Sequence, residues 1–227
     1  MPLRPPEPGG ILAELRSRVP PEVDRILRRS ADQGFMGAMP VADQIDHSLG
    51  FVFAAESVLA RRPTSFVDLG TGGGVPGLVL VACWPECRAV LLEVNERRAE
   101  FLDASTIGWR RGGTVEVLRG RAEAVARDAA FRQQFELVTS RSFGPPPVAA
   151  ECGAPLLEVG GLLVVSEPPE GSGADRWPGG GLAEVGLTEA ADVRFDDRFG
   201  YRVLLKVEPS SDRYPRRVGV PAKRPLF

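Results

Sequence analysis

A glycine-rich stretch between two apolar runs holds the residues of this chain that are best suited to bind a cofactor. Asp68 lies at the end of the first run, and Glu93 ends the second. Glycine lets a strand-to-helix turn bend sharply and approach a ligand closely, and a carboxylate after the next strand can accept both hydrogen bonds of a ribose diol. The spacing therefore predicts a nucleotide-type cofactor site whose turn contains Gly70, Gly72 and Gly74.

Two classes of cofactor fit this layout. The glycines from Gly72 to Gly77 have the G-x-G-x-x-G spacing that also holds the pyrophosphate of a nicotinamide dinucleotide at a helix N-terminus. Asp68, however, would repel a pyrophosphate and attract the cationic sulfonium of S-adenosylmethionine. We therefore predict that the chain binds S-adenosylmethionine, and we keep a nicotinamide-dependent oxidoreductase as an alternative.

The elements that must position these residues follow from the hydrophobic pattern. Apolar residues recur at helical spacing before the glycine stretch, whereas strand-like and helix-like runs alternate after it. This alternation predicts a mostly parallel sheet with helices on both faces and a ligand site at the carboxyl ends of the strands. Strands are predicted at 65–69, 89–93, 115–118, 137–140, 162–166 and 202–207. Helices are predicted as two short segments between 11 and 27, and then at 41–59, 75–83, 96–107, 122–134 and 148–157.

The chain divides into four segments by composition. The proline- and glycine-rich residues 1–10 are expected to be disordered, and residues 11–62 are expected to form a helical cap on the sheet. Residues 63–212 would form the cofactor-binding domain. Within it, the stretch 167–181 is rich in proline, glycine and acid, which predicts a mobile loop over the carboxyl edge of the sheet. Residues 213–227 would form a basic arm.

Composition limits the classes of function that the chain can have. Its 227 residues carry a formal net charge of -2, so contact with nucleic acid would depend on a local basic patch. No apolar run reaches about 18 residues, the length of a membrane span. The three cysteines and one histidine do not predict a four-ligand zinc site, because Cys83 and Cys87 flank a predicted helix end and no second closely spaced pair of ligands exists. We therefore expect a cytoplasmic protein with no membrane association and no metal, in which His47 is a helix-surface or packing residue.

The chain has a basic patch near its C-terminus. No acidic residue follows Asp212, while five cations do, and prolines restrict the backbone between them. A cluster of this kind suits RNA phosphates, with a solvated run of charge as the alternative. We predict an ordered RNA-binding arm with contacts from Arg213, Arg216, Arg217, Lys223 and Arg224.

Five blocks of the sequence together carry a resemblance to a known family. They are Phe66 to Gly77, Leu91 to Leu102, Gly120 to Glu123, Thr139 to Arg141 and the tail from Tyr214 to Leu226. With these blocks the sequence resembles the bacterial ribosomal RNA small subunit methyltransferase G family, also called the glucose-inhibited division protein B type. The resemblance spans roughly residue 34 to the C-terminus, and the tail is its most specific block because general methyltransferases lack it.

The resemblance implies a class I, Rossmann-like methyltransferase with a doubly wound seven-stranded sheet. Members of the family transfer a methyl group from S-adenosylmethionine to N7 of a guanine in 16S ribosomal RNA. The implied partner is therefore this RNA or the small ribosomal subunit, and we expect a monomer. Carried over by position, the site residues are Gly70 and Val75 along the donor, Glu93 at its ribose, Ala122 and Glu123 at its adenine, and Arg141 beside the donor and target base as the catalytic residue.

Methyl transfer to guanine N7 is consistent with the absence from this sequence of the motif used for methylating exocyclic amines. The N7 atom carries an in-plane lone pair and no proton, so the reaction needs no general base, and positioning with electrostatics suffices. Enzymes that methylate exocyclic amines typically carry an Asn/Asp-Pro-Pro-aromatic motif after the fourth strand. This chain has Arg141-Ser142-Phe143-Gly144-Pro145 there.

Two stretches depart from the family pattern. The family usually ends the fifth strand with Lys-Gly, whereas this chain has Glu167-Pro168, which puts an anion where RNA favours a cation. Residues 44–49 match the family's His-x-x-Asp-Ser helix motif only loosely. Two alternatives therefore stay open: a methyltransferase for another RNA or a small molecule, and a non-catalytic RNA-binding relative.

Overall fold

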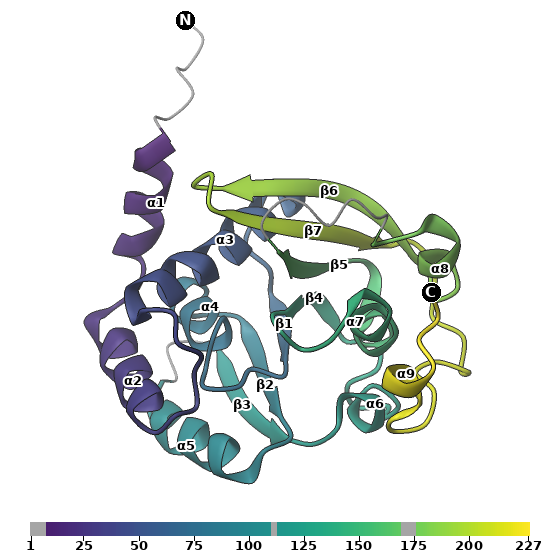
Figure 1. The fold of residues 1–227 in the computed structure, drawn as a ribbon, viewed down its shortest axis with the longest axis horizontal. Coiled ribbons are helices and arrows are strands. Elements are labelled where there is room, and N and C mark those ends of the chain that lie inside the picture. Colours follow the sequence, from purple (N-terminus) through teal and green to yellow (C-terminus); the bar gives the residue numbers. More distant parts are fainter. Residues whose placement is uncertain (1–7, 110–112, 169–175) are drawn as a thin grey trace, which may run out of the picture.

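Within the residues that the computed structural model describes, 8–109, 113–168 and 176–227, the strands form one seven-stranded sheet with helices on both faces (Figure 1). The strands are β1 (Ser65–Leu69), β2 (Arg88–Glu93), β3 (Thr114–Arg119), β4 (Phe135–Ser140), β5 (Leu157–Glu167), β6 (Leu187–Phe195) and β7 (Phe199–Lys206). Their order across the sheet is β3-β2-β1-β4-β5-β7-β6. β1 to β5 pair in parallel, and β7 runs antiparallel to both of its neighbours. The predicted doubly wound, mostly parallel α/β sheet is confirmed.

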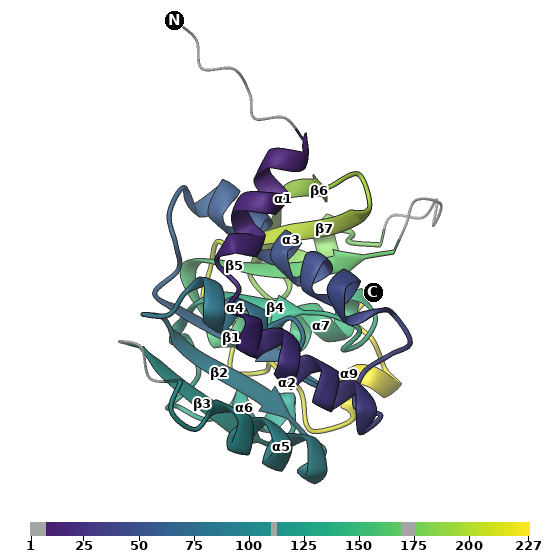
Figure 2. The same ribbon diagram turned by 90° about the vertical axis from the view of Figure 1, so that its left-hand side faces the viewer.

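The helices lie in two layers (Figures 1 and 2). The core on one face of the sheet takes side chains from α1 (Pro8–Ser17), α2 (Pro21–Asp32), α3 (Val41–Leu59), α4 (Gly77–Cys83) and α5 (Glu96–Thr106). The core on the other face takes them from α6 (Ala122–Val125), α7 (Pro146–Gly153) and α8 (Gly179–Ala183). Near the C-terminus, α9 (Val220–Lys223) packs against α7.

The sheet separates the two cores because side chains alternate along each strand. In β1, Phe66 packs on the α4 side, whereas Val67 and Leu69 join the opposite core. Both faces of β1 are buried, as is usual for a central parallel strand, so its sequence is a short apolar run interrupted only by Asp68. Asp68 shares the face of Phe66 and therefore points toward α4.

The helix predicted at 122–134 is wrong beyond its first turn. α6 ends at Val125, turns follow it, and Gln133 has a left-handed backbone with φ of 55°. This segment is held instead by Arg132, whose guanidinium donates to the carbonyl oxygens of Ser210 and Tyr214, both at 2.8 Å. Contacts with residues that are distant in the sequence override the local helical pattern here.

Other predicted boundaries also differ from the structure. β6 is missing from the predicted strands because it is an edge strand with mostly exposed or half-buried side chains. The disorder predicted at 1–10 is wrong for residues 8–10, which belong to α1, and residues 1–7 lie outside the described ranges. The loop predicted at 167–181 is wrong at both ends, since Glu167 ends β5 and 179–181 lie in α8. The part at 169–175 lies outside the described residues.

Candidate active site

The turn after β1 needs glycine for its backbone conformation and its packing. Gly70 and Gly74 have φ values of 65° and 108°, in the region that disfavours any residue with a Cβ. A Cβ on Gly74 would lie 2.5 Å from Leu78 Cδ1, and one on Gly70 would lie 2.9 Å from Phe143 Cδ2. Glycine is therefore required at both positions of the turn at the carboxyl edge of the sheet.

Asp68 anchors this turn and does not face a ligand. Its carboxylate is fully buried, Oδ2 accepts from Gly77 N at 2.9 Å, and Oδ1 accepts from Thr139 Oγ1 at 2.8 Å. Burial raises the pKa of Asp68 to about 6, although these hydrogen bonds oppose the shift. Both oxygens are thus used inside the fold, and the expectation that the carboxylate attracts the sulfonium, which needs no direct contact, stays a prediction. Asp68 ties the end of β1 to α4 and β4.

Glu93 lies at the end of β2 and clamps two loops of the site. Its side chain is 4% exposed, Oε2 accepts from Gly72 N at 2.9 Å, and Oε1 accepts from Asn95 N at 2.7 Å. Each carboxylate oxygen has a second lone pair beyond the one used by the backbone. Glu93 can therefore organise the turn and still accept hydrogen bonds from a ribose.

A cavity of about 290 Å³ opens at this carboxyl edge. Its walls come from the loops after β1, β2, β3 and β4, with apolar contributions from Leu92 and Val94. The structure thus brings together at one cavity four residues predicted from three separate sequence blocks: Gly70, Glu93, Ala122 and Glu123.

The C-terminal arm, residues 213–227, closes one side of the cavity. Ala222 of the arm is a lining residue, and Gly219 N donates to Glu123 Oε1 at 2.8 Å. In Figure 1 the yellow arm with α9 runs beside α6 and α7. Glu123, which we expected to meet only the adenine, therefore also binds the arm, a contact that the sequence does not reveal.

Arg216 has a partner inside the fold. Its Nε donates to Glu151 Oε1 at 2.9 Å, its Nη2 donates to Oε2 at 2.6 Å, and Glu151 is fully buried on α7. Arg216 Nη2 also donates to the carbonyl of Arg224 at 2.7 Å. The Arg216 guanidinium therefore anchors the arm, and its predicted contact with RNA stays a prediction.

The other four cations of the arm face outward. Their side chains are exposed, and within the described ranges no carboxylate lies within 4.0 Å of their charged atoms. The Arg213 guanidinium stacks over the Tyr214 ring at 5.4 Å from its centroid. The outer face of the arm is thus a cationic surface made of Arg213, Arg217, Lys223 and Arg224.

Arg141 follows β4 at the same edge of the sheet. Its Nη2 donates to the side-chain oxygen of Gln44 on α3, and its Nη1 is buried with no hydrogen-bond partner in the described part of the chain. Burial lowers the pKa of Arg141, while the nearby Tyr201 and Asp68 raise it. Sequence reasoning missed Gln44, for which the only signal was its place in the loosely matching segment 44–49.

Glu167, at the end of β5, has its negative charge balanced by an ion pair. Its Oε2 forms an ion pair with Arg176, and its Oε1 accepts from Trp177 Nε1 at 2.8 Å. The anion that departs from the family pattern therefore has a cationic partner and is largely buried.

The histidine and cysteines pack in the core. His47 lies among aromatic rings, with the Phe199 centroid at 4.8 Å, and burial lowers the pKa of His47 to about 3, so the imidazole is neutral. Cys83, Cys87 and Cys152 are buried free thiols. Over the described ranges, no group of three or more His, Cys, Asp or Glu side chains is placed to hold a metal ion, and no helix is long and apolar enough to cross a membrane.

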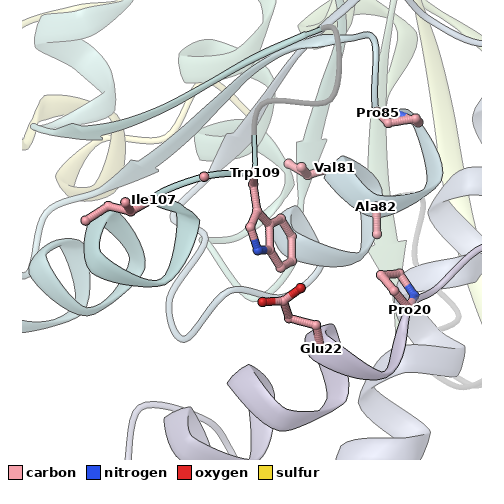
Figure 3. Close-up of a pocket in the computed structure, with 8 residues that line it drawn as sticks. Pro20, Glu22, Val81, Ala82, Pro85, Ile107 and Trp109 are labelled. Carbon is pink, nitrogen blue, oxygen red and sulfur yellow. The ribbon is translucent and has the colours of Figure 1, made fainter.

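A second cavity, of about 130 Å³, lies at the opposite end of the strands (Figure 3). It lies between the start of α2, the end of α4 and the segment after α5, and the Glu22 carboxylate in it points toward the Trp109 ring. None of the predicted site residues lines it. The predicted site residues Gly70, Glu93, Ala122 and Glu123 instead line the cavity at the carboxyl edge.

Comparison with known proteins identifies the family. The sequence model of the rRNA small subunit methyltransferase G family matches residues 43–167, more than half of the chain. The ribosomal RNA small subunit methyltransferase G of Rubrobacter xylanophilus is 39% identical over 174 residues, covering 73% of this chain and 66% of that protein. That of Moorella thermoacetica is 35% identical over 172 residues, covering 70% and 68%. The match spans about two thirds of the length of these relatives.

Solved structures share the fold at lower identity. The cofactor-bound crystal structure of Rv0187 from MTB aligns with a TM-score of 0.58 at 20% identity, covering 90% of this chain and 100% of that chain. The fibrillarin pre-rRNA processing protein of Methanococcus jannaschii aligns with a TM-score of 0.51 at 12% identity, covering 65% and 69%. These likenesses concern the fold alone. The family match and the relatives show that the chain belongs to the ribosomal RNA small subunit methyltransferase G family.

Proposed function

We propose that this chain transfers a methyl group from S-adenosylmethionine to N7 of a guanine in 16S ribosomal RNA. The observation that carries the proposal is the cavity at the carboxyl edge, where Gly70, Glu93 and Ala122 meet beside an arm with a cationic outer face. Membership of the family supports ribosomal RNA as the substrate class. The proposal includes a monomer that acts in the cytoplasm on the RNA or on the small ribosomal subunit.

The chemistry of the cavity walls suits S-adenosylmethionine. Glu93 keeps one lone pair on each oxygen for the ribose hydroxyls. Leu92, Val94 and Ala122 supply apolar surface for a purine ring. Gly70 and Phe143 also line the cavity, and Phe143 packs so closely on Gly70 that only glycine fits there.

Methyl transfer requires the protein to position the two substrates and to stabilise the charge of the reacting groups. When bound, S-adenosylmethionine supplies an electrophilic methyl group on a sulfonium. Guanine N7 presents its lone pair without a proton, so no side chain has to act as a general base. The buried, unpaired Nη1 of Arg141 can donate to an acceptor oxygen of the base or of the donor and fix it in line.

RNA would be held by the outer face of the C-terminal arm. Lys223 and Arg224 lie close to the donor cavity because their neighbour Ala222 lines it, and Arg213 and Arg217 belong to the same arm. Phosphate contacts of this kind position a nucleic acid without reading its sequence. The arm would therefore hold the RNA while the residues near Arg141 meet the target base.

The test is transfer of labelled methyl from S-adenosylmethionine to small ribosomal subunits that lack the modification, followed by nucleoside analysis. Label recovered as 7-methylguanosine supports the proposal, and naked 16S RNA assayed in parallel separates RNA from assembled subunit as the substrate. Donor binding without transfer to either would favour another acceptor. Absence of donor binding would leave a non-catalytic RNA-binding protein.

A further inference from the structure

Gln44 reaches Arg141 from a rigid part of the fold. It lies in the first turn of the 19-residue helix α3, and its side chain is 2% exposed. Its amide oxygen accepts from Arg141 Nη2, and its amide nitrogen donates to the carbonyl of Met39 at 3.3 Å. With both ends of the amide engaged, the orientation of the side chain is fixed by its partners.

Arg141 is a half-buried cation with a fully buried Nη1, and among the described residues it has no ion-pair partner. In the described part of the chain no carboxylate lies within 4.0 Å of its guanidinium, and Nη1 has no acceptor. A charge and an N–H donor that are withdrawn from water without partners lower the free energy of unfolding. Such an arrangement is retained where a ligand supplies the missing acceptor. The positive charge of Arg141 is therefore not neutralised by a neighbouring carboxylate of the described residues, and Nη1 can donate a hydrogen bond to a group that binds at the carboxyl edge.

We propose that Gln44 is a positioning residue for Arg141, and that a neutral amide is required there because it orients the guanidinium without cancelling its charge. A carboxylate at position 44 would reach the same nitrogen but would neutralise the cation that acts on the substrate. This inference rests on the proposed function, in which Arg141 acts at the reacting end of the donor.

Two substitutions of Gln44 by residues of nearly the same size separate the effect of orienting the Arg141 guanidinium from the effect of neutralising its charge. Gln44→Glu keeps the hydrogen bond to Arg141 and adds a negative charge, whereas Gln44→Leu removes the bond and adds none. In the donor-free protein, Gln44→Glu should melt above Gln44→Leu, because Glu gives Arg141 an ion pair whereas both variants lose the hydrogen bond to the Met39 carbonyl. Both should lower kcat for methyl transfer at least tenfold. The Kd for S-adenosylmethionine should stay within about threefold of wild type, since the cavity around Glu93 is untouched.

Ser48→Ala is the matched control. Ser48 is fully buried one turn along α3, and its hydroxyl donates to the Gln44 backbone carbonyl at 2.7 Å. This variant should lower the melting temperature and keep kcat within about twofold of wild type. A merely structural role for Gln44 would make kcat follow the melting temperature across all three variants, and that result overturns the inference.

Failure of the proposed function is distinguishable from failure of this inference. If the wild-type protein transfers no methyl group to RNA, the proposed function fails. The inference is then judged on the donor-free protein, in which Gln44→Leu must melt at a lower temperature than Gln44→Glu. The reverse order overturns it, as does full activity of Gln44→Glu when the wild type is active.

Discussion

Glu151 on α7 and Arg216 in the C-terminal arm form a two-point ion pair with distances of 2.9 Å and 2.6 Å. The Arg216 backbone N also donates to Glu151 Oε1 at 2.7 Å, so a single buried carboxylate accepts three hydrogen bonds from one residue. This pair fixes the segment that carries Ala222 to the wall of the donor cavity. Arm order and donor binding are therefore linked.

Removing Arg216 should damage both stability and donor binding. Arg216→Ala leaves the buried carboxylate of Glu151 without its cationic partner and with only the backbone hydrogen bond, which costs about 3 kcal/mol in the free energy of unfolding. The arm then loses its anchor, and the Kd for S-adenosylmethionine should rise. Urea denaturation and calorimetric titration measure the two effects. The neighbouring Arg217→Ala, at an exposed position, serves as the control and should change neither; unaltered donor affinity in Arg216→Ala would contradict the role of the arm in the cavity.

The outer cations of the arm should affect RNA alone. Arg217→Ala combined with Lys223→Ala removes two exposed charges that lack carboxylate partners in the described ranges. RNA affinity should fall, and the slope of log K against log salt should decrease by about 1.5 because two phosphate contacts are lost. Filter binding at several salt concentrations measures this.

The control for this pair is Arg61→Ala with Arg62→Ala. It removes the same charge from exposed residues just before β1, at the amino end of the sheet. The control should leave the salt slope unchanged. An equal decrease in both double variants would mean that overall charge, and not the arm, governs RNA binding.

Glu93 should control donor affinity. Glu93→Gln replaces one acceptor oxygen by an amide nitrogen, which cannot accept from Gly72 N or Asn95 N. Both the glycine turn and the ribose site lose a hydrogen-bond acceptor. The Kd for S-adenosylmethionine should therefore rise at least tenfold, which corresponds to a loss of about 1.4 kcal/mol in binding free energy. Calorimetric titration measures this against Glu96→Gln, an exposed carboxylate on α5. Comparable losses in both variants would remove Glu93 from the site.

Lys206 should make stability rise with pH. It is 1% exposed on β7, its ammonium donates to Val185 O at 2.6 Å, and burial lowers the pKa of Lys206 from 10.5 to about 7, with a smaller contribution from Arg132. Between these two pKa values the unfolded chain binds more protons than the folded one, so the free energy of unfolding increases with pH across this window. The increase from pH 7 to 9 amounts to about 2 kcal/mol.

Lys206→Met isolates the contribution that the titration of Lys206 makes to the free energy of unfolding, because methionine has a side chain of similar length and cannot titrate. Urea denaturation of both proteins at pH 6.5, 8 and 9 gives the difference in their free energies of unfolding. That difference should grow with pH in favour of the wild type. A constant difference would show that Lys206 is charged in the folded state across the whole range.

The cofactor edge could be predicted because its signals are local. The apolar run of β1, the glycine turn and the carboxylate of Glu93 lie within thirty residues, and each has a short-range physical reason for its residue type. The fold class follows from the alternation of elements in the same way. The helix at 122–134 fails because Arg132 binds carbonyls that no local pattern reveals.

The roles of individual charges were harder to predict. Arg216 and Arg217 are adjacent arginines in the sequence, yet one is anchored in the fold and the other is exposed. A signal did exist in Glu151, the only charged residue between Arg141 and Glu158, since a lone acid in an apolar helix has to find a cation. Its partner lies 65 positions away and could not be identified from the sequence.

The two faces of the C-terminal arm have a thermodynamic consequence. One segment carries the cations for RNA on its outer side and part of the donor cavity on its inner side. Arg216 already anchors the arm, so an RNA bound to its outer cations would further restrain Ala222 on the inner side and favour donor binding, and the donor would favour RNA binding in turn. By linkage the two enhancements are equal, so each substrate raises the affinity for the other by the same factor.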